Sequence, residues 1–404
     1  MIQIIDKEKC CGCAACFNAC PKNCITMRSD EEGFLYPFVD ETICNDCGIC
    51  EKVCPELHPV KESIVEQKAF LVQHKNGNIR KESTSGGAFT AISEYVIKQG
   101  GVVFGVAYDK NFHVIHKFVE NTEDLRFFRN SKYVQSIVGD TFSQAKEFLK
   151  LGRLVCFSGT PCQIEGLKKY LNKEYVNLIT VDIVCRAVPS PLVWDKYLSF
   201  QGVNSKNTNN ILFRDKKYFG YKYSVMSIYN QNNKEKYHDG IDTDVMLRAF
   251  FSNVCDRPSC YSCSFKKRYR ISDFTLWDCF DVAKFSKKLD DDKGTTRILT
   301  HTEKANQILE KISDKVIIER IDVELAIAGV REMIKSVPTN PKREVFFKDL
   351  SVLEPSVFFR KYFPNNIRAR LEKNARIVSY KLGVYQLMKN IVKSIYQNKS
   401  NQKK

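Results

Sequence analysis

The sequence predicts an α+β protein with a small cysteine-rich N-terminal domain, a larger α/β domain around a central sheet, and a helical C-terminal tail. Eight closely spaced cysteines near the N-terminus define the first part. Apolar segments of strand and helix length alternate between residues 83 and 200, which predicts the second part. A terminal segment rich in Lys and Arg, with apolar residues at helical spacing, predicts the third. At 404 residues the chain has room for two or three domains.

The N-terminal cysteines form two copies of one motif, C-x2-C-x2-C-x3-C followed by proline. In this spacing one loop supplies three thiolates to a cubane iron–sulfur cluster, and the last cysteine of the run binds the other cluster. The expected ligands of the two 4Fe–4S clusters are Cys10, Cys13, Cys16 and Cys54 for the first, and Cys44, Cys47, Cys50 and Cys20 for the second. This part of the chain is therefore predicted to transfer single electrons.

Two structural zinc sites or a disulfide framework are the alternatives for these cysteines. Zinc ribbons use paired knuckles or mixed Cys/His sets, whereas no histidine interrupts either motif here. Residues 1–58 resemble a bacterial two-cluster ferredoxin, in which the runs 2–5 and 34–39 would form the small strands. Cys11 and Cys24 lie outside the motif and are expected to be buried or spare thiols.

Composition narrows the class of protein. Hydrophobic residues make up 43% of the chain, enough for a sizeable core, and no apolar stretch approaches the length of a membrane span. The first ten residues lack an apolar leader segment, and the chain contains 17 cysteines. These features predict a cytoplasmic protein whose thiols bind metal rather than pair, and an anaerobic setting is compatible with exposed clusters.

The predicted tail, residues 345–404, concentrates the positive charge. From residue 360 onward it contains twelve Lys and Arg residues and one acid, Glu372, which accounts for +11 of the net charge of +16. Its apolar residues recur at helical spacing and predict amphipathic helices. Such helices pack on their own protein, contact an anionic membrane surface or dock on a partner. Nucleic-acid binding is not expected, because no recognised module accompanies the charge.

The central part of the chain is expected to alternate strands and helices in order. The expected strands are 69–73, 102–108, 153–157 and 176–185, and the expected helices are 89–99, 141–151 and 164–171. Gly100 and Gly101 end the first of these helices, and a turn at 158–161 follows the third strand. Residues 201–240 read as polar strands with loops, and residues 303–345 as helical. This alternation predicts layers around a central sheet.

A second group of cysteines is expected to form another metal site. Its members are Cys162, Cys185, Cys260 and Cys263. The first two follow apolar strands, and the last two form a C-x-x-C loop, so the four can converge on one rim of the sheet. We interpret them as ligands of a third 4Fe–4S cluster, with a zinc site or an unrelated dithiol as alternatives. Cys156 is expected in the core, and Cys255 and Cys279 are ambiguous.

Several strings in the central region resemble the beta subunit of deazaflavin (coenzyme F-420) hydrogenases and dehydrogenases. They are Thr84-Ser-Gly-Gly87, residues 100–108, residues 131–136, Phe157-Ser-Gly-Thr-Pro-Cys-Gln163, residues 213–216, Arg257-Pro-Ser-Cys-Tyr-Ser-Cys263, Ser272-Asp273 and residues 291–295. The resemblance covers about residues 67–335. Two departures from the family pattern, Arg186-Ala187 and residues 277–281, remove glycines that could approach a ligand closely.

The resemblance implies a flavoprotein domain at 67–335 that binds FAD and supports the third cluster. The candidate FAD contacts are Ser85, Gly86, Gly87, Lys132, Tyr133, Gly159 and Thr160. Ser85, Gly86 and Gly87 precede a helix whose free backbone N–H groups could hold a phosphate, although a plain helix cap explains Ser85 equally well. Asp278 and Asp291 are candidate proton donors, and no catalytic residue is assigned.

The sequence therefore predicts an iron–sulfur flavoprotein oxidoreductase. Electrons would move between the ferredoxin-type clusters and an organic substrate or deazaflavin through FAD, which exchanges one or two electrons. A redox partner, such as a ferredoxin or another subunit, is expected. Some family members are linked to polysaccharide biosynthesis, but the substrate of this chain is not identified. The alternatives are a non-catalytic electron-transfer subunit of a larger complex and a zinc-stabilised interaction protein.

Overall fold

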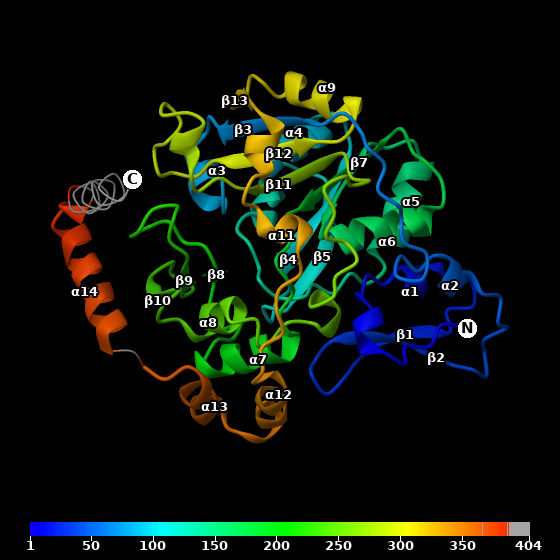
Figure 1. Cartoon of the computed structure of the whole chain (residues 1–404), viewed down its shortest axis with the longest axis horizontal. Helices are drawn as coiled ribbons and strands as arrows, with labels where there is room; N and C mark the ends of the chain where they lie inside the picture. Colours follow the sequence, from blue (N-terminus) through cyan, green and yellow to red (C-terminus); the bar gives the residue numbers. More distant parts are fainter. Residues whose placement is uncertain (366, 386, 388–404) are drawn as a thin grey trace.

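The computed structural model describes residues 1–365, 367–385 and 387. The N-terminal cysteine-rich unit lies at one end of the molecule and helix α14 (Ile367–Lys381) at the other (Figure 1). A large sheet and a smaller one lie between them. None of the described helices is long and apolar enough to cross a bilayer. The part of the predicted tail from residue 388 onward lies outside the described residues.

The N-terminal unit consists of short helices and one hairpin. Its elements are η1 (Lys7–Lys9), α1 (Ala15–Ala19), β1 (Ile25–Ser29), β2 (Leu35–Val39) and α2 (Ile49–Lys52). Strands β1 and β2 pair antiparallel. The expected strand at 34–39 corresponds to β2, but the prediction of a strand at 2–5 is wrong. That segment is irregular and packs Ile2 against the cysteine loops, while residues 25–29 pair with β2.

The large sheet has eight strands in the order β13-β3-β12-β11-β7-β6-β4-β5. Their bounds are β3 (Lys68–His74), β4 (Val102–Tyr108), β5 (Val114–Val119), β6 (Val155–Gly159), β7 (Leu178–Ile183), β11 (Phe274–Asp278), β12 (Thr296–Thr300) and β13 (Val316–Ile321). Strands β4, β6, β7 and β11 run parallel, and the remaining neighbours pair antiparallel. The sheet is therefore mixed, with its apolar parallel strands in the centre.

Helices cover both faces of this sheet. Helices α4 (Ala88–Lys98) and α9 (Glu303–Lys311) pack into one apolar core, and α5 (Thr141–Lys150) and α6 (Pro161–Leu171) into another. The two cores contain residues of alternating direction on the same strands, such as Val102 and Val103 of β4. The expected central strands and helices agree with these elements to within a few residues. The expected helical segment 303–345 also contains strand β13, which sequence reasoning missed because its apolar run is short.

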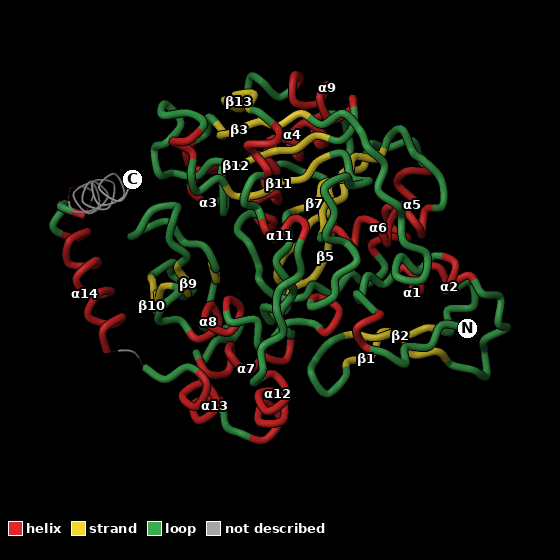
Figure 2. Tube along the Cα trace, viewed as in Figure 1, coloured by secondary structure: helices red, strands yellow, loops and turns green. Residues whose placement is uncertain are grey.

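A smaller antiparallel sheet and several helices form the remaining body (Figure 2). The sheet consists of β8 (Asn210–Leu212), β9 (Val225–Tyr229) and β10 (Glu235–Gly240). The helices and turns not yet named are α3 (Gly77–Glu82), η2 (Glu123–Phe128), α7 (Pro191–Phe200), α8 (Val245–Phe251), η3 (Pro258–Cys260), η4 (Val282–Lys284), α10 (Val323–Ile327), α11 (Arg331–Ile334), α12 (Arg343–Val352) and α13 (Pro355–Tyr362).

The segment predicted as a tail divides into two kinds of structure. Helices α12 and α13 bury Phe346, Phe358 and Phe359 in a core shared with α7, α8 and the smaller sheet. Helix α14 lies beside that sheet, where Lys373 pairs with Asp239 and Arg376 lies over the Tyr223 ring. Most of the residues of α14 remain exposed.

Candidate iron–sulfur and sheet-edge sites

The motif cysteines surround two cavities. Cys10, Cys13, Cys16 and Cys54 line the first cavity, together with Cys11. The second cavity is lined by Cys44, Cys47, Cys50 and Cys20, together with Cys24. Each cavity thus takes three cysteines from one motif and one from the other, as the two-cluster ligand pattern requires. The donor set and its arrangement fit two 4Fe–4S clusters.

The two cysteine loops share an unusual backbone. In the first loop Gly12 and Ala14 have positive φ angles of 70° and 62°, and in the second Asp46 and Gly48 have 51° and 71°. These residues occupy equivalent positions in the two motifs. A left-handed residue before each short helix turns the chain so that successive thiols face the cavity. The duplicated sequence therefore repeats as a duplicated conformation.

Cys11 and Cys24 lie beside the motif cysteines. The Cys24 Sγ atom lies 3.3 Å from the Cys20 Sγ atom. The Cys11 thiol interacts with the thiols of Cys13 and Cys162. Both cysteines are buried, as expected. Both also lie next to motif cysteines, which the expectation of spare thiols did not include. Cys11 lies between the first cavity and the second group of cysteines.

The second group of cysteines gathers where the central strands end. Cys162 opens α6 directly after β6, Cys185 follows β7, Cys260 ends η3, and Cys263 lies in the next turn. Burial raises the pKa of Cys185 to about 12, with Cys162 and Cys263 adding to the shift and Lys266 opposing it. Burial also raises the pKa of Cys263 to about 11, and Cys162 is the next contributor. These mutual effects place the four thiols in one neighbourhood.

A single metal ion is a poorer match for the motif cysteines that line the two cavities. Four thiolates around one zinc ion lie about 3.8 Å apart, given Zn–S distances near 2.3 Å. The motif cysteines instead border cavities, which suits a larger inorganic group.

The loop with Cys260 and Cys263 is attached to the N-terminal unit. Ser262 donates a hydrogen bond to Glu8 at 3.1 Å, and Ser264 donates one to Glu56 at 2.8 Å. Glu56 also lines the first cavity. These contacts hold the second cysteine group next to the first cavity.

A polar cluster lies at the carboxyl end of β11. Arg214 forms an ion pair with Asp278 at 3.0 Å and donates to the Tyr133 hydroxyl at 3.3 Å. The Tyr221 hydroxyl donates to Asp278 at 3.2 Å and lies 3.4 Å from the Ser85 hydroxyl. Arg214 and Tyr221 are buried. Ligands of open α/β sheets bind outside the carboxyl ends of parallel strands, so this edge is the candidate organic site.

The other expected FAD contacts are already engaged within the protein. The Gly86 amide donates to Thr296 Oγ1 at 2.9 Å, and Gly86 packs directly against β3 and β12. Gly87 is the left-handed residue that starts α4. Lys132 donates to three carbonyl oxygens of its own loop, and burial lowers its pKa to about 7. The Gly86 amide is therefore already engaged within the protein, and the phosphate site expected at Ser85, Gly86 and Gly87 stays a prediction.

Gly159 and Thr160 lie at a different point of the same sheet edge, beside Cys162. The Thr160 hydroxyl lies 3.1 Å from the Cys162 sulfur, and the Thr160 amide donates to the Gln163 side chain. A Cβ atom at Gly159 would lie 3.0 Å from Gln163 Oε1. These two residues thus shape the start of α6 and the position of Cys162.

The remaining candidates have structural surroundings. Burial would raise the pKa of Asp291, but hydrogen bonds from Arg80 outweigh it and hold that pKa below its ordinary value. Asp291 is thus unsuited to donate a proton near neutral pH. Cys279 packs among Leu71, Val282 and Leu289 rather than with the second cysteine group. Cys156 and Cys255 are buried in apolar cores.

Arg186 directly follows Cys185 and is part of one of the two departures from the family pattern. It pairs with Glu332 at 3.2 Å and donates to the Asn253 side chain at 2.8 Å. Lys266 donates to the Arg186 carbonyl at 3.0 Å. This departure from the family pattern therefore forms structural contacts beside the second cysteine group.

Sequence reasoning missed the contacts of Arg257, Arg214 and Tyr221. All three are buried, although two of them are charged. Arg214 and Arg257 lie in strings that carried the family resemblance, but their partners are distant in the sequence. A charged residue beside a cysteine motif, as in Arg257-Pro-Ser-Cys, was the available signal.

Comparison with known proteins agrees with both parts of the molecule. Residues 152–325 match the family described as the C terminus of the coenzyme F420 hydrogenase/dehydrogenase beta subunit, and residues 9–57 match the 4Fe-4S dicluster domain. Residues 152–325 therefore form a region similar to the coenzyme F420 hydrogenase/dehydrogenase beta subunits. The chain carries an N-terminal 4Fe–4S dicluster domain and is related to iron–sulfur oxidoreductases.

Individual relatives cover different parts of this chain. Coenzyme F420-dependent sulfite reductase of Methanocaldococcus jannaschii is 30% identical over 168 residues, 41% of this chain and 26% of the relative. The F subunit of the F(420)H(2) dehydrogenase of Methanosarcina mazei is 23% identical over 198 residues, 45% of this chain and 55% of the relative. The chain thus spans about a quarter and about half of these two proteins.

Two further comparisons concern the N-terminal unit and the fold. An uncharacterized ferredoxin of Methanocaldococcus jannaschii is 40% identical over 52 residues, 13% of this chain and 66% of that protein. A solved chain of the F420-reducing hydrogenase complex from Methanosarcina barkeri matches with a TM-score of 0.43 and 15% identity. That match covers 75% of this chain and 92% of the solved one, and its score is too low to support an inference.

Proposed function

We propose that this chain moves single electrons between a protein partner and a flavin-type acceptor through three 4Fe–4S clusters. The electrons would enter at the Cys44, Cys47, Cys50 and Cys20 cavity and pass to the Cys10, Cys13, Cys16 and Cys54 cavity. They would then reach the group formed by Cys162, Cys185, Cys260 and Cys263. Family members include oxidoreductases. Electrons would also be able to move through these sites in the reverse direction.

The gradient of burial carries this proposal. Cys47 at the second cavity is exposed, whereas Cys13 and Cys16 at the first cavity are buried. Cys11 then contacts both Cys13 and Cys162, so the first cavity and the second cysteine group adjoin. An exposed entry point followed by buried sites is the arrangement that a relay from a protein partner into an enclosed site requires.

The proposed acceptor is FAD at the carboxyl edge of β11, with deazaflavin or another organic molecule as its exchange partner. A flavin would supply the conversion between one- and two-electron steps. The ion pair of the buried Arg214 with the partly exposed Asp278 would orient a polar ligand. Burial lowers the pKa of Lys216 to about 7, and its Nζ atom donates to the carbonyl oxygens of Arg80, Ser85 and Lys293 beside this edge.

The test is anaerobic purification with iron, sulfide, zinc and flavin quantified together. Three clusters predict about twelve iron atoms per chain, and the acceptor proposal adds one flavin. Zinc without acid-labile sulfide would overturn the whole proposal. Reduction of a flavin or deazaflavin by a reduced ferredoxin-type donor would then measure activity.

A non-catalytic relay subunit is the second candidate. The occupied Gly86 amide and Lys132 ammonium favour it, because two of the expected flavin contacts are unavailable as they stand. It predicts iron in the same cysteine sites but no flavin and no reduction of a small acceptor by the isolated chain. We also propose that the chain divides into parts at 1–58, 67–335 and 345–404. We further propose a cytoplasmic location.

Helix α14 supports a further proposal, contact with an anionic membrane surface. Ile367, Leu371, Val378 and Leu382 share one helical face and are between 54% and 75% exposed. Arg368, Arg370 and Lys381 flank this stripe. Apolar residues bordered by cations suit a headgroup region that contains acidic lipid.

Vesicle sedimentation tests this contact with the full chain. The protein should bind vesicles that contain phosphatidylserine and not pure phosphatidylcholine vesicles. The double substitution Leu371→Glu with Val378→Glu should abolish binding, and Val176→Glu, at a residue 92% exposed elsewhere, should not. Equal binding by the double variant would refute the proposal, as would self-association through the same stripe.

A further inference from the structure

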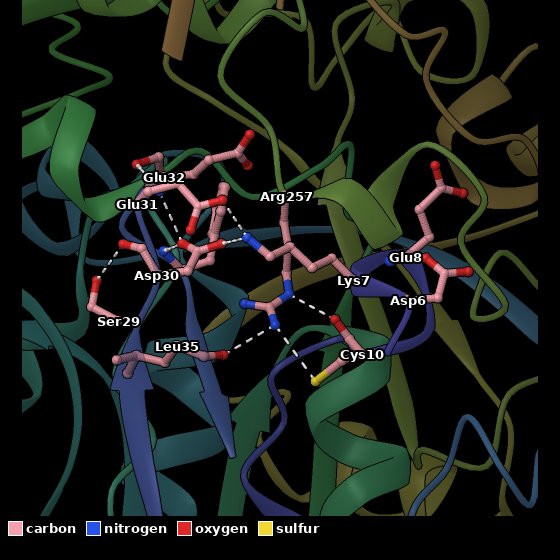
Figure 3. Close-up of polar contacts among 12 residues, drawn as sticks. Asp6, Lys7, Glu8, Cys10, Ser29, Asp30, Glu31, Glu32, Leu35 and Arg257 are labelled. Atoms are coloured by element: carbon pink, nitrogen blue, oxygen red, sulfur yellow. Dashed lines mark hydrogen bonds and ion pairs between the residues drawn. The ribbon is translucent and has the colours of Figure 1, made fainter. Parts of the chain in front are cut away.

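Arg257 precedes the loop that carries Cys260 and Cys263, and its side chain reaches Cys10 and Leu35 of the N-terminal unit (Figure 3). Its Nε atom donates to the Cys10 carbonyl at 2.8 Å, and its Nη2 atom approaches the Cys10 sulfur at 3.6 Å. The same Nη2 atom donates to the Leu35 carbonyl at 3.0 Å. The Nη1 atom donates to Gln135 Oε1 at 2.9 Å.

The guanidinium group is enclosed as well as hydrogen-bonded. Arg257 is 0% exposed and lies over the Tyr36 ring at 4.2 Å. A Cβ atom at Gly12 would come within 2.8 Å of Arg257 Nη1 and 2.5 Å of Gln135 Nε2. The glycine of the first loop therefore makes room for this cation. The second loop has Asp46 at the equivalent position.

The charged groups differ between the two cavities. Glu56 is the acidic residue that lines the first cavity and opposes Arg257. Asp46 lines the second cavity, and neither cavity has Lys or Arg among the described residues that line it, so Arg257 acts on the first cavity through its contact with the Cys10 sulfur. The Met1 ammonium group lies at the second cavity too, but it is paired with Asp46 at 2.6 Å and with Glu51 at 3.2 Å. A cation next to a ligand sulfur is thus a feature of the first cavity.

We propose that Arg257 raises the reduction potential of the first cluster above that of the second, and so directs electrons inward. This inference rests on the proposed function. A cluster gains one negative charge on reduction, and an adjacent buried cation stabilises that charge. One electron leaves the second cluster, which is oxidised, and enters the first, which is reduced. No bond forms or breaks, and the partner protein supplies the next electron.

EPR-monitored redox titration of the purified holoprotein tests the inference. Arg257→Gln should lower the midpoint potential of the first cluster most, lower that of the third cluster less because Cys260 is also near the cation, and leave that of the second unchanged. We expect at least a tenfold change in the reduced-to-oxidised ratio at a given potential, which is about 59 mV for a one-electron couple. Arg257→Lys keeps a charge but loses the planar fork, so its shift should be smaller.

Two other substitutions test the sign without removing the arginine. Gln135→Glu adds an anion against Arg257 Nη1 and should lower the midpoint potential of the first cluster. Glu56→Gln removes the opposing carboxylate and should raise it. These variants decide the question if Arg257→Gln does not fold.

Arg343→Gln is the matched control. Arg343 is a partly buried arginine at the same boundary, where it pairs with Glu32 and donates to the Asp256 carbonyl at 3.1 Å. Loss of Arg343 should weaken the contact between residues 1–58 and the rest of the chain without shifting the midpoint potential of any cluster. Unchanged potentials in iron-replete Arg257 and Gln135 variants would overturn the inference, as would an equal shift in Arg343→Gln. Absence of clusters from the wild-type protein would instead refute the proposed function.

Discussion

The two cysteine cavities have the same ligand pattern and the same loop backbone but different surroundings. The first cavity borders a core that Cys11, Cys13 and Ala15 share with strands β4 and β6 and helices α5 and α6. The cysteines of the second cavity pack in a small cluster formed within the N-terminal unit. Duplication of a motif thus produced two similar sites, and docking against the larger domain made them unequal.

The different surroundings of the two cavities separate the proposed site of electron entry from the site next to the second cysteine group. The second cavity keeps one cysteine, Cys47, open to solvent. The first adjoins the group that follows the central strands, and Arg257 reaches it from the same loop. The two cavities have the same kind of ligand. Their two proposed roles therefore depend on burial and on the Arg257 cation rather than on ligand identity.

The largest expected contrast comes from removing one ligand from each cavity. Cys16→Ser and Cys47→Ser should each lose about four iron atoms. Cys16 is buried and packs within the N-terminal core, so its substitution should also lower the melting temperature and stop electron transfer inward. Cys47→Ser should leave the fold and the first cluster intact. Iron and sulfide analysis, EPR spin counts and thermal melting measure these effects, and loss of both clusters in Cys47→Ser would contradict the contrast.

A smaller contrast is expected between two loop glycines. Gly12→Ala combines a positive φ with a clash against Gln135 and Arg257, so it should reduce the free energy of unfolding by about 3 kcal/mol. Gly48→Ala has the same φ strain but nothing within 4 Å of its Cβ, so about 1 kcal/mol is expected. Denaturant unfolding of both variants measures the difference. Equal losses would show that backbone conformation, not Arg257, requires the glycine.

The smallest expected contrast is in the pH dependence of stability, between the N-terminal unit and the larger domain. Burial lowers the pKa of His116, and of His301, to about 4 in the larger domain. The single histidine of residues 1–58, His58, is exposed. Unfolded histidines titrate near 6.5, so the stability of the larger domain is complete above that pH and falls as the pH drops towards 4.

Acid unfolding measures this last contrast. At pH 5.5 the expected loss is about 1 kcal/mol for each histidine relative to pH 7. Both tryptophans, Trp194 and Trp277, lie in the larger domain, so their fluorescence reports its denaturant midpoint. Visible absorbance reports the clusters. A midpoint that does not change between pH 7 and 5.5, or that changes equally in His116→Gln, would contradict the assignment.

Much of the central domain was predictable because its elements are local patterns. The buried run of β6 and the turn that places Cys162 at the start of α6 are readable from neighbouring residues. The short strand β13 and the pairing of β2 with residues 25–29 were not, because a partner distant from the apolar run decides them. The engagement of the Gly86 amide was not predictable for the same reason, since its partner Thr296 is 210 positions away in the chain.

By itself the sequence determined the metal-binding chemistry, because the spacing of thiols along one loop selects the inorganic group that they can hold. Only the tertiary structure decided how the two cavities differ. Arg257 meets Cys10 across 247 positions of the chain, and Cys11 meets Cys162 from separate domains. Contacts of that range follow from packing of whole layers, which residue spacing does not encode.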